Sequence, residues 1–235
     1  MIDLKKAGIV GGIGPASTHD YYSGIINGVR AKASGENYPE IIINSVNMTK
    51  MLKLISNNDW EPLVDMLLIA INDLAAAGAD FAAIASNTPH IVFDRVQRQA
   101  KLPIISIVDV TCKYAQAKNV KKAVIIGTRF TMGSGLYSEA MERCKVATVT
   151  PSEDEQIAIH NIIFPRLEDG IVVPEDKQRM LGIVNGLIFE HNADALLLGC
   201  TELPLMIKSD DVDTIVLNTT QIHIDAIVRS ICANS

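Results

Sequence analysis

One cysteine stands where a thiol could take part in proton transfer. Cys200 follows three leucines and a glycine, and it is followed by Thr201 and Glu202. An apolar run of this kind is typical of a buried strand, and in open α/β sheets ligands bind at the carboxyl ends of strands. A thiol at that position is a candidate nucleophile or general base, since neighbouring groups can lower its pKa from about 8.5. The alternative is packing, because cysteine is also common as a small buried side chain.

A second polar residue repeats the position of this cysteine. Ser86 and Cys200 each stand six residues after an Ala-Asp pair that opens an apolar run, and their separation is 200 − 86 = 114 residues. A Lys-Lys-Ala segment at Lys5 recurs at Lys121, a separation of 121 − 5 = 116. This period is too long for a solenoid. It predicts two similar halves, and a pseudo-twofold relation between them would direct Ser86 and Cys200 at one cleft.

The chemistry open to Ser86 depends on a partner. A serine hydroxyl is a very weak base unless another group activates it, although it can donate a proton directly or through water. His90, four residues further along, is the nearest candidate partner. The structural alternatives are that Ser86 caps a helix and that His90 is a surface or hydrogen-bonded residue.

Other polar residues at predicted strand ends suit a small carboxylate ligand. The candidate substrate-binding residues are Asn47, Asn87, Thr88, Thr128, Thr201 and Glu202. Arg129 and Arg166 are candidates for a bidentate pair with a second carboxylate, or for solvated surface residues.

A glycine-rich turn runs from Gly11 to Pro15, directly after the first apolar run. Backbone N–H groups at such a turn can hold a carboxylate or phosphate. The match to the dinucleotide-binding pattern is poor, because Ser17 stands where a third glycine is required. A tight turn between a strand and a helix is the alternative interpretation.

Apolar runs and amphipathic segments alternate along the chain, which predicts an α/β fold with largely parallel sheets. We expect two pseudo-symmetric open parallel-sheet domains with the active site in the cleft between them. The first would contain residues 1–108 plus 216–235 and the Ser86 loop, and the second residues 109–215 and the Cys200 loop. Strands are expected at 7–10, 40–46, 79–85, 102–106, 122–126, 146–149, 194–198 and 213–217, and helices at 16–29, 60–77, 91–100, 109–118, 133–143, 151–167, 175–192 and 220–232.

The composition limits the possible partners. The 235 residues are 48% hydrophobic, enough for a sizeable core, and the net charge is 21 − 27 = −6, which argues against nucleic-acid binding. No apolar stretch approaches a membrane span, and we expect no signal peptide. The four cysteines form no CxxC pair and no zinc-like cluster. We therefore expect a cytoplasmic protein with reduced thiols, no metal and no membrane partner.

Four short segments resemble, in order, the motifs of the aspartate/glutamate racemase family. They are Gly11 to Pro15, Ser86 to His90, Gly127 to Met132 and Gly199 to Leu203. The resemblance spans nearly the whole chain, and it implies racemisation of an amino acid with two carboxylates without pyridoxal phosphate, metal or other cofactor. In that family two residues, usually both cysteines, exchange the Cα proton from opposite faces of the substrate. Donors around the α-carboxylate must stabilise the carbanion, and Asn87, Thr88 and Thr201 are the candidates here. The family also suggests a homodimer.

The chain departs from the family at Ser86, where a cysteine is expected. Three explanations are open: an engineered substitution that traps a ligand, a natural variant similar to the L-specific aspartate/glutamate racemases, or loss of racemisation in favour of one-sided chemistry. A Ser/Cys pair is asymmetric, because Cys200 can remove a proton that Ser86 would remove only poorly. With the handedness of the family, we predict faster conversion from L to D than from D to L.

Two other functions compete with the racemase interpretation. The first is a cofactor-independent decarboxylase of the same superfamily, such as one acting on malonates, in which only the thiol at Cys200 is required. The second is a protein that binds a small dicarboxylate without catalysis. The sequence does not distinguish aspartate from glutamate as the substrate.

Overall fold

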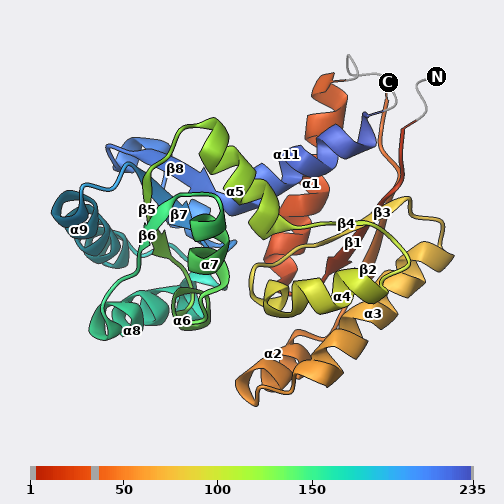
Figure 1. The fold of residues 1–235 in the computed structure, drawn as a ribbon, viewed down its shortest axis with the longest axis horizontal. Helices are drawn as coiled ribbons and strands as arrows, with labels where there is room; N and C mark the ends of the chain where they lie inside the picture. Colours follow the sequence, from red (N-terminus) through yellow and green to blue (C-terminus); the bar gives the residue numbers. More distant parts are fainter. Residues whose placement is uncertain (1–3, 33–36, 234–235) are drawn as a thin grey trace. The chain divides into compact units, whose positions relative to one another are not determined.

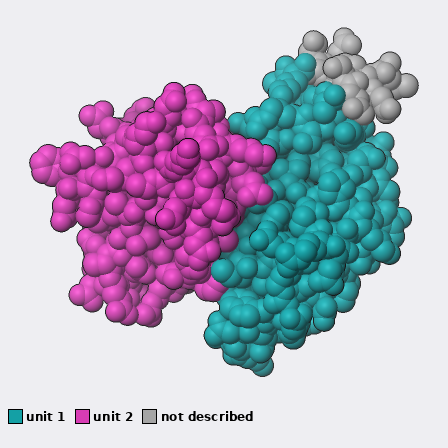
Figure 2. Space-filling model, in the orientation of Figure 1, with its two compact units in different colours: residues 1–107, 223–235 teal, residues 108–222 magenta. Residues whose placement is uncertain are grey.

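The structure, a computed structural model, describes residues 4–32 and 37–233. The chain divides into two compact units, coloured separately in Figure 2. Unit 1 contains residues 1–107 and 223–235, and unit 2 contains residues 108–222. Among the described residues, no helix combines the length and apolar character needed to cross a membrane.

Unit 1 is built on a parallel sheet of four strands in the order β2-β1-β3-β4 (Figure 1). The strands are β1 (Ala7–Gly11), β2 (Ile41–Ser45), β3 (Phe81–Ile84) and β4 (Ile104–Ile105). The helices are α1 (Pro15–Lys32), α2 (Met48–Ser56), α3 (Trp60–Ala76), the 3-10 turn η1 (Thr88–Val92) and α4 (Phe93–Gln99), and most of α11 (Thr219–Ile231) belongs to this unit.

Unit 2 repeats this arrangement with the strand order β6-β5-β7-β8, again all parallel. Its strands are β5 (Lys122–Ile126), β6 (Ala147–Val149), β7 (Ala195–Leu198) and β8 (Ile215–Asn218). Its helices are most of α5 (Ile107–Ala117), α6 (Arg129–Gly133), α7 (Leu136–Arg143), α8 (Glu153–Ile162), the π-helical turn η2 (Ile163–Leu167), α9 (Pro174–His191), α10 (Leu203–Met206) and the 3-10 turn η3 (Ser209–Asp211). The expected two-domain α/β fold with parallel sheets is confirmed.

The repeated Lys-Lys and Ala-Asp segments hold each other at the amino ends of the central strands. In unit 1 the Lys6 N–H donates to the Asp80 carboxylate at 2.6 Å, and the Asp80 N–H donates to the Lys6 carbonyl at 2.9 Å. In unit 2 the Lys122 N–H donates to Asp194 at 2.8 Å, and the Asp194 N–H returns to the Lys122 carbonyl at 3.0 Å. The repeat seen in the sequence therefore pairs the central strands at their amino ends, at the opposite end from Ser86 and Cys200.

Each sheet has its own apolar core. In unit 1, Tyr21, Ile25 and Val29 lie four residues apart on one face of α1 and pack with β1, β3 and α11. In unit 2, Leu196 and Leu198 of β7 pack with buried residues of α8 and α9, and Cys200 belongs to the same cluster. Burial on both faces explains why the central strands read as continuous apolar runs.

The structure corrects several boundaries expected from the sequence. The predicted first domain included residues 216–222, but β8 pairs with β7 of the second sheet, so this segment belongs to unit 2. The expected helix 133–143 is two helices, α6 and α7, because Gly135 between them has φ +77°. The expected helix 151–167 is interrupted at Phe164, whose backbone is extended. Helices α2 and α10 were not predicted.

Candidate functional site

Ser86 and Cys200 occupy equivalent positions in the two units. Each stands two residues after the last residue of a strand, β3 and β7, that lies between two other strands (Figure 1). The residue just before each of them pairs with the neighbouring strand in the same way. The Ala85 N–H donates to the Val10 carbonyl at 2.9 Å, and the Gly199 N–H donates to the Ile126 carbonyl at 2.7 Å. The backbone frame around the two candidate residues is thus duplicated.

Gly199 is needed for close packing rather than for an unusual backbone angle. A Cβ built on it would lie 2.8 Å from Cγ2 of Thr131 and 3.0 Å from the Ile126 carbonyl oxygen. The neighbouring α6 therefore approaches the Cys200 loop more closely than a side chain at Gly199 would permit.

The Cys200 thiol is paired with a carboxylate. Cys200 is 6% exposed, and its thiol donates a hydrogen bond to Oε2 of Glu202 at 2.9 Å. The other oxygen of Glu202 accepts a hydrogen bond of 2.7 Å from the Thr201 hydroxyl. Burial, followed by the charge of Glu202, raises the pKa of the thiol well above its usual value. The thiol therefore keeps its proton, and an acceptor is already aligned with it.

A second carboxyl group, which the sequence analysis missed, completes this cluster. The sulfur of Cys200 and one carboxylate oxygen from each of Glu168 and Glu202 lie within 4.8 Å of one another. Burial, the charge of Glu202 and the charge of Asp169 raise the pKa of Glu168 to about 7. Glu168 follows η2, which packs against α10 directly after Glu202. No spacing in the sequence indicates this contact, because 200 − 168 = 32 residues separate the thiol from Glu168.

In the described part of the chain, these three groups are the cluster of possible ligands that could hold a metal ion. Thiolate and carboxylate ligands suit a divalent cation such as zinc. However, the hydrogen bond from Cys200 to Glu202 contains a proton that a metal would displace. The arrangement as it stands is that of an acid and its proton acceptor.

His90 does not act on the Ser86 hydroxyl, contrary to the sequence-based hypothesis. Its Nδ1 lies 2.9 Å from the Ser86 carbonyl oxygen, and its Nε2 accepts the Ile107 N–H at 3.3 Å. Both ring nitrogens are therefore committed to the backbone, with the proton on Nδ1. Phe93 stacks on the ring, and burial lowers the pKa of His90 to about 4. His90 is a neutral residue that fixes the loop.

Two further side chains that the sequence did not indicate hold the Ser86 loop and its surroundings. The Ser17 hydroxyl, at the start of α1, donates to the Ala85 carbonyl at 2.9 Å. His223 bonds the Ile105 carbonyl at 2.9 Å through Nε2 and pairs with the Tyr21 hydroxyl at 2.7 Å through Nδ1. Burial lowers the pKa of His223 to about 3, so it too remains neutral. The hydrogen bonds that hold the carboxyl end of the first sheet thus come from uncharged side chains.

Several predicted substrate-binding residues have local structural bonds. Asn47 caps α2 by accepting the Lys50 N–H at 2.9 Å, and Thr128 caps α6 by accepting the Thr131 N–H at 3.2 Å. The Thr201 hydroxyl donates to Glu202 at 2.7 Å. Asn87 is buried, and Thr88 begins the turn η1 that follows Ser86. Their roles as substrate ligands remain predictions.

The two arginines proposed for a second carboxylate each form a surface ion pair within unit 2. Arg129 pairs with Glu153 at 3.1 Å, and Arg166 pairs with Asp176 at 2.8 Å. Both guanidinium side chains are about half exposed. The structure therefore favours the alternative interpretation of these residues as surface side chains.

The glycine-rich turn is closed by its own helix. Gly12 has φ +82°, and its N–H donates to the Thr18 hydroxyl at 2.8 Å. The Gly11 carbonyl accepts the Val46 N–H at 2.9 Å. The first of these bonds uses an N–H group that an anion would require, and the second fixes the turn to the segment after β2, so both favour the tight-turn interpretation.

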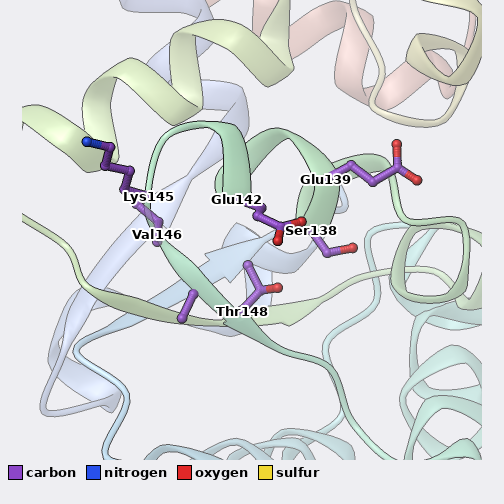
Figure 3. Close-up of a pocket in the computed structure, with 7 residues that line it drawn as sticks. Ser138, Glu139, Glu142, Lys145, Val146 and Thr148 are labelled. Atoms are coloured by element: carbon purple, nitrogen blue, oxygen red, sulfur yellow. The ribbon is translucent and has the colours of Figure 1, made fainter.

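A surface hollow of 470 Å³ lies elsewhere in unit 2. It is lined by α7 and the segment through β6, and Ser138 and Glu142 of α7 lie near Thr148 (Figure 3). None of the predicted site residues lines it, so it is separate from the Cys200 cluster.

Comparison with known proteins agrees with the fold and the motifs. Residues 10–227 match the Asp/Glu/Hydantoin racemase family. The chain is 25% identical over 201 residues to the broad specificity amino-acid racemase RacX of Bacillus subtilis, which covers 83% of this chain and 85% of that one.

Two solved structures are similar over almost the full chain. An aspartate racemase homologue from Pyrococcus horikoshii has 34% identity and a TM-score of 0.86, and covers 96% of this chain and 98% of its own. A putative Asp/Glu racemase from Yersinia pestis has 28% identity and a TM-score of 0.89, with the same coverage. The chain belongs to the Asp/Glu/Hydantoin racemase family.

Proposed function

We propose that this protein racemises aspartate, glutamate or both without pyridoxal phosphate, with Cys200 as the base toward the L enantiomer. The observation that carries the proposal is the 2.9 Å hydrogen bond from the Cys200 thiol to the Glu202 carboxylate. This bond gives the thiol proton a destination, which is the requirement for a cysteine to act as a base. Family membership supports racemase activity.

The proposed reaction begins with transfer of the Cys200 proton to Glu202. The resulting thiolate removes the Cα proton of the L-amino acid, and Ser86 donates its hydroxyl proton to the opposite face of the carbanion. The product is the D-amino acid. Ser86 then regains a proton from water, and Glu202 releases its proton to water, so the protons balance.

Glu168 is suited to binding the substrate's ammonium group. Its pKa of about 7 reflects burial and two acidic neighbours, and a cation beside it would stabilise the ionised form. The same positive charge would lower the pKa of Cys200, so binding of the substrate would favour formation of the thiolate. The base would then become active when the substrate is present.

The preference for the L enantiomer follows from the difference between the two loops. Among the described residues, Cys200 has a carboxylate partner, whereas the ring of His90 bonds the carbonyl of Ser86 and not its hydroxyl. A hydroxyl without an activating base donates a proton more readily than it removes one. We therefore expect Cα proton removal from the L enantiomer to be faster than from the D enantiomer.

A second candidate function is a cofactor-independent decarboxylase, because the same asymmetry would suffice for it. In that reaction loss of carbon dioxide forms the carbanion, and Cys200 would only donate its proton to one face. The buried thiol, with its raised pKa, is well suited to proton donation.

The experiment that tests the proposal is Cα deuterium exchange, followed by proton NMR in D₂O without added cofactor. L- and D-aspartate and L- and D-glutamate are incubated separately with the wild-type protein and with Cys200→Ala. We expect exchange of an L enantiomer to exceed that of its D counterpart and to be lost in Cys200→Ala. Equal rates for both enantiomers would contradict the L preference.

Absence of exchange from all four amino acids would overturn the racemase proposal. Release of carbon dioxide from a disubstituted malonate, lost in Cys200→Ala, would then support the decarboxylase. Dicarboxylate binding that is unchanged in Cys200→Ala, with neither reaction, would indicate a binding protein.

A further inference from the structure

Two cysteines that the proposed reaction does not use lie together in unit 2. Cys112 is on α5 and is 3% exposed, and Cys144 follows the last residue of α7 and is half-buried. Both are free thiols. The Cys144 side chain is within hydrogen-bonding reach of the Cys112 thiol, and this contact adds to burial in raising the pKa of Cys112 to about 12.

A second contact independently holds Cys144 against the same face of α5. Gln116, one turn beyond Cys112 on this helix, donates from Nε2 to the Cys144 carbonyl at 3.2 Å. Side chains four residues apart lie on one face of a helix. Side chain and backbone of Cys144 are therefore both held by one strip of α5.

The backbone around Cys144 is also well fixed. Its N–H donates to the Met141 carbonyl at 2.9 Å, and the Val146 N–H donates to the same oxygen at 2.9 Å. Lys145 between them adopts a left-handed conformation with φ +61°, which ends α7. A cysteine in such a tight helix end has little freedom to move away from its neighbour.

We propose that Cys112 and Cys144 form a reversible intramolecular disulfide when the protein meets a peroxide. The thiol of Cys144, which is less buried than that of Cys112, attacks one peroxide oxygen as its thiolate; the O–O bond breaks, a sulfenic acid forms and the first water leaves. The Cys112 sulfur then attacks the sulfenic sulfur. The S–S bond forms, the S–O bond breaks and a second water leaves. The two thiols lose two protons and two electrons in total, and the peroxide is reduced to two waters.

Access distinguishes this pair from Cys200. Glu142 and Lys145, on either side of Cys144 in the chain, line the open hollow shown in Figure 3. Cys200 instead is buried and its thiol proton is bonded to Glu202. An oxidant from solvent therefore reaches Cys144 before Cys200, and the disulfide would connect α5 to the end of α7 while the candidate base stays reduced.

The test is peptide mass spectrometry of the full-length protein after treatment with hydrogen peroxide, under non-reducing conditions. We expect a cross-linked pair of peptides containing Cys112 and Cys144, lighter than the two thiol peptides by two hydrogen atoms. Alkylation should show loss of two of the four thiols, and dithiothreitol should restore both. Cys144→Ser should abolish the cross-link, and Cys232→Ser, the matched control, should leave it unchanged.

Several outcomes would overturn this proposal without depending on any variant. They are a cross-link between two chains, oxidation of Cys144 only to sulfinic or sulfonic acid, or oxidation of Cys200 before the pair in the wild-type protein. A further variant tests the geometry, because Gln116→Ala removes the bond to the Cys144 carbonyl and should slow disulfide formation at least severalfold. Circular dichroism of each variant checks that it folds. None of these measurements depends on the racemase proposal.

Discussion

The Ser86 and Cys200 loops share one backbone frame and differ in their chemistry. The carbonyl of Ser86 is bonded by His90, which burial keeps uncharged. Cys200 lies beside two carboxyl groups, one bonded to its thiol and one with a pKa of about 7. The strands and their pairing are therefore equivalent in the two units, whereas the polar residues that follow each strand differ. In the proposed reaction, Cys200 of unit 2 removes a proton and Ser86 of unit 1 supplies one.

Of the variants that test this difference between the loops, the largest loss of activity is expected from a substitution of Glu202. Glu202→Gln keeps the shape of the side chain but removes the acceptor for the thiol proton. We expect exchange of the L substrate to fall by about 10²–10⁴-fold, the usual contribution of a positioned acid or base. The measurement is kcat/KM for Cα deuterium exchange. A loss of less than about threefold would show that Cys200 becomes a thiolate without Glu202.

Glu168→Gln is the matched control, because it removes the neighbouring carboxylate without breaking the bond to the thiol. If Glu168 binds the ammonium group, its substitution should raise KM more than it lowers kcat. An equal loss of kcat in both variants would mean that the two carboxyl groups act as one proton acceptor.

The next prediction makes the two loops alike. Ser86→Cys places a thiol, with a pKa of about 8.5 when unperturbed, where a hydroxyl now stands. We expect exchange of the D substrate to increase by at least about tenfold, with a smaller change for the L substrate. The ratio of the two exchange rates is the readout. An unchanged ratio would contradict the proposal that the Ser86 side limits proton removal from the D enantiomer.

Sequence patterns predicted the central strands and the places of the two loops well, because these depend on short apolar runs and on the internal repeat. They did not predict which atoms the side chains meet. The four-residue spacing makes His90 the nearest candidate partner of the Ser86 hydroxyl, but the fold of the loop brings its ring to the Ser86 carbonyl instead. The sequence pattern places Asn47 at the polar end of a strand, whereas in the structure it caps helix α2, which was not predicted.

Glu168 shows why the rest of the site could not be predicted. It joins Cys200 through the packing of η2 on α10, and that contact depends on the whole tertiary arrangement of unit 2. A carboxyl group next to an interrupted helix has no distinctive spacing. Only its burial beside a second acid identifies it, and burial is not visible in the sequence.

A smaller effect, on the free energy of unfolding, tests whether both units can accept a Cβ at the residue before Ser86 or Cys200. Ala85 and Gly199 are equivalent, and Ala85 is already fully buried with its Cβ. Gly199→Ala would place a Cβ 2.8 Å from Thr131, so we expect a loss of about 1–3 kcal/mol in the free energy of unfolding. Ala85→Gly should cost about 1 kcal/mol, from a small cavity and greater chain entropy. Urea denaturation measures both, and a neutral Gly199→Ala would show that α6 can move away.

A last effect concerns pH, where the two loops should respond with opposite signs. The pKa of His90 is lowered from 6.5 to about 4, so between these values the unfolded chain binds the proton and the folded protein does not. Unit 1 therefore gains stability as pH rises through this range and loses it as pH falls. The pKa of Glu168 is raised from 4.5 to about 7, so there the folded protein holds the extra proton, and unit 2 loses stability as pH rises from 4.5 to 7.

Variants that do not titrate separate these two contributions. Glu168→Gln should become more stable relative to the wild type as pH rises from 4.5 to 7, and the gain should level off above pH 7. Its slope should stay below the about 1.4 kcal/mol per pH unit of a full proton, because Glu168 is only half-buried. His90→Gln should be less stable at every pH, since it loses the stacked ring and its two backbone bonds, but the deficit should shrink as pH falls toward 4. Thermal unfolding at half-unit steps from pH 4 to 8 measures both differences. Slopes of the same sign would mean that the charge environments of the two loops do not differ in the way that their hydrogen bonds indicate.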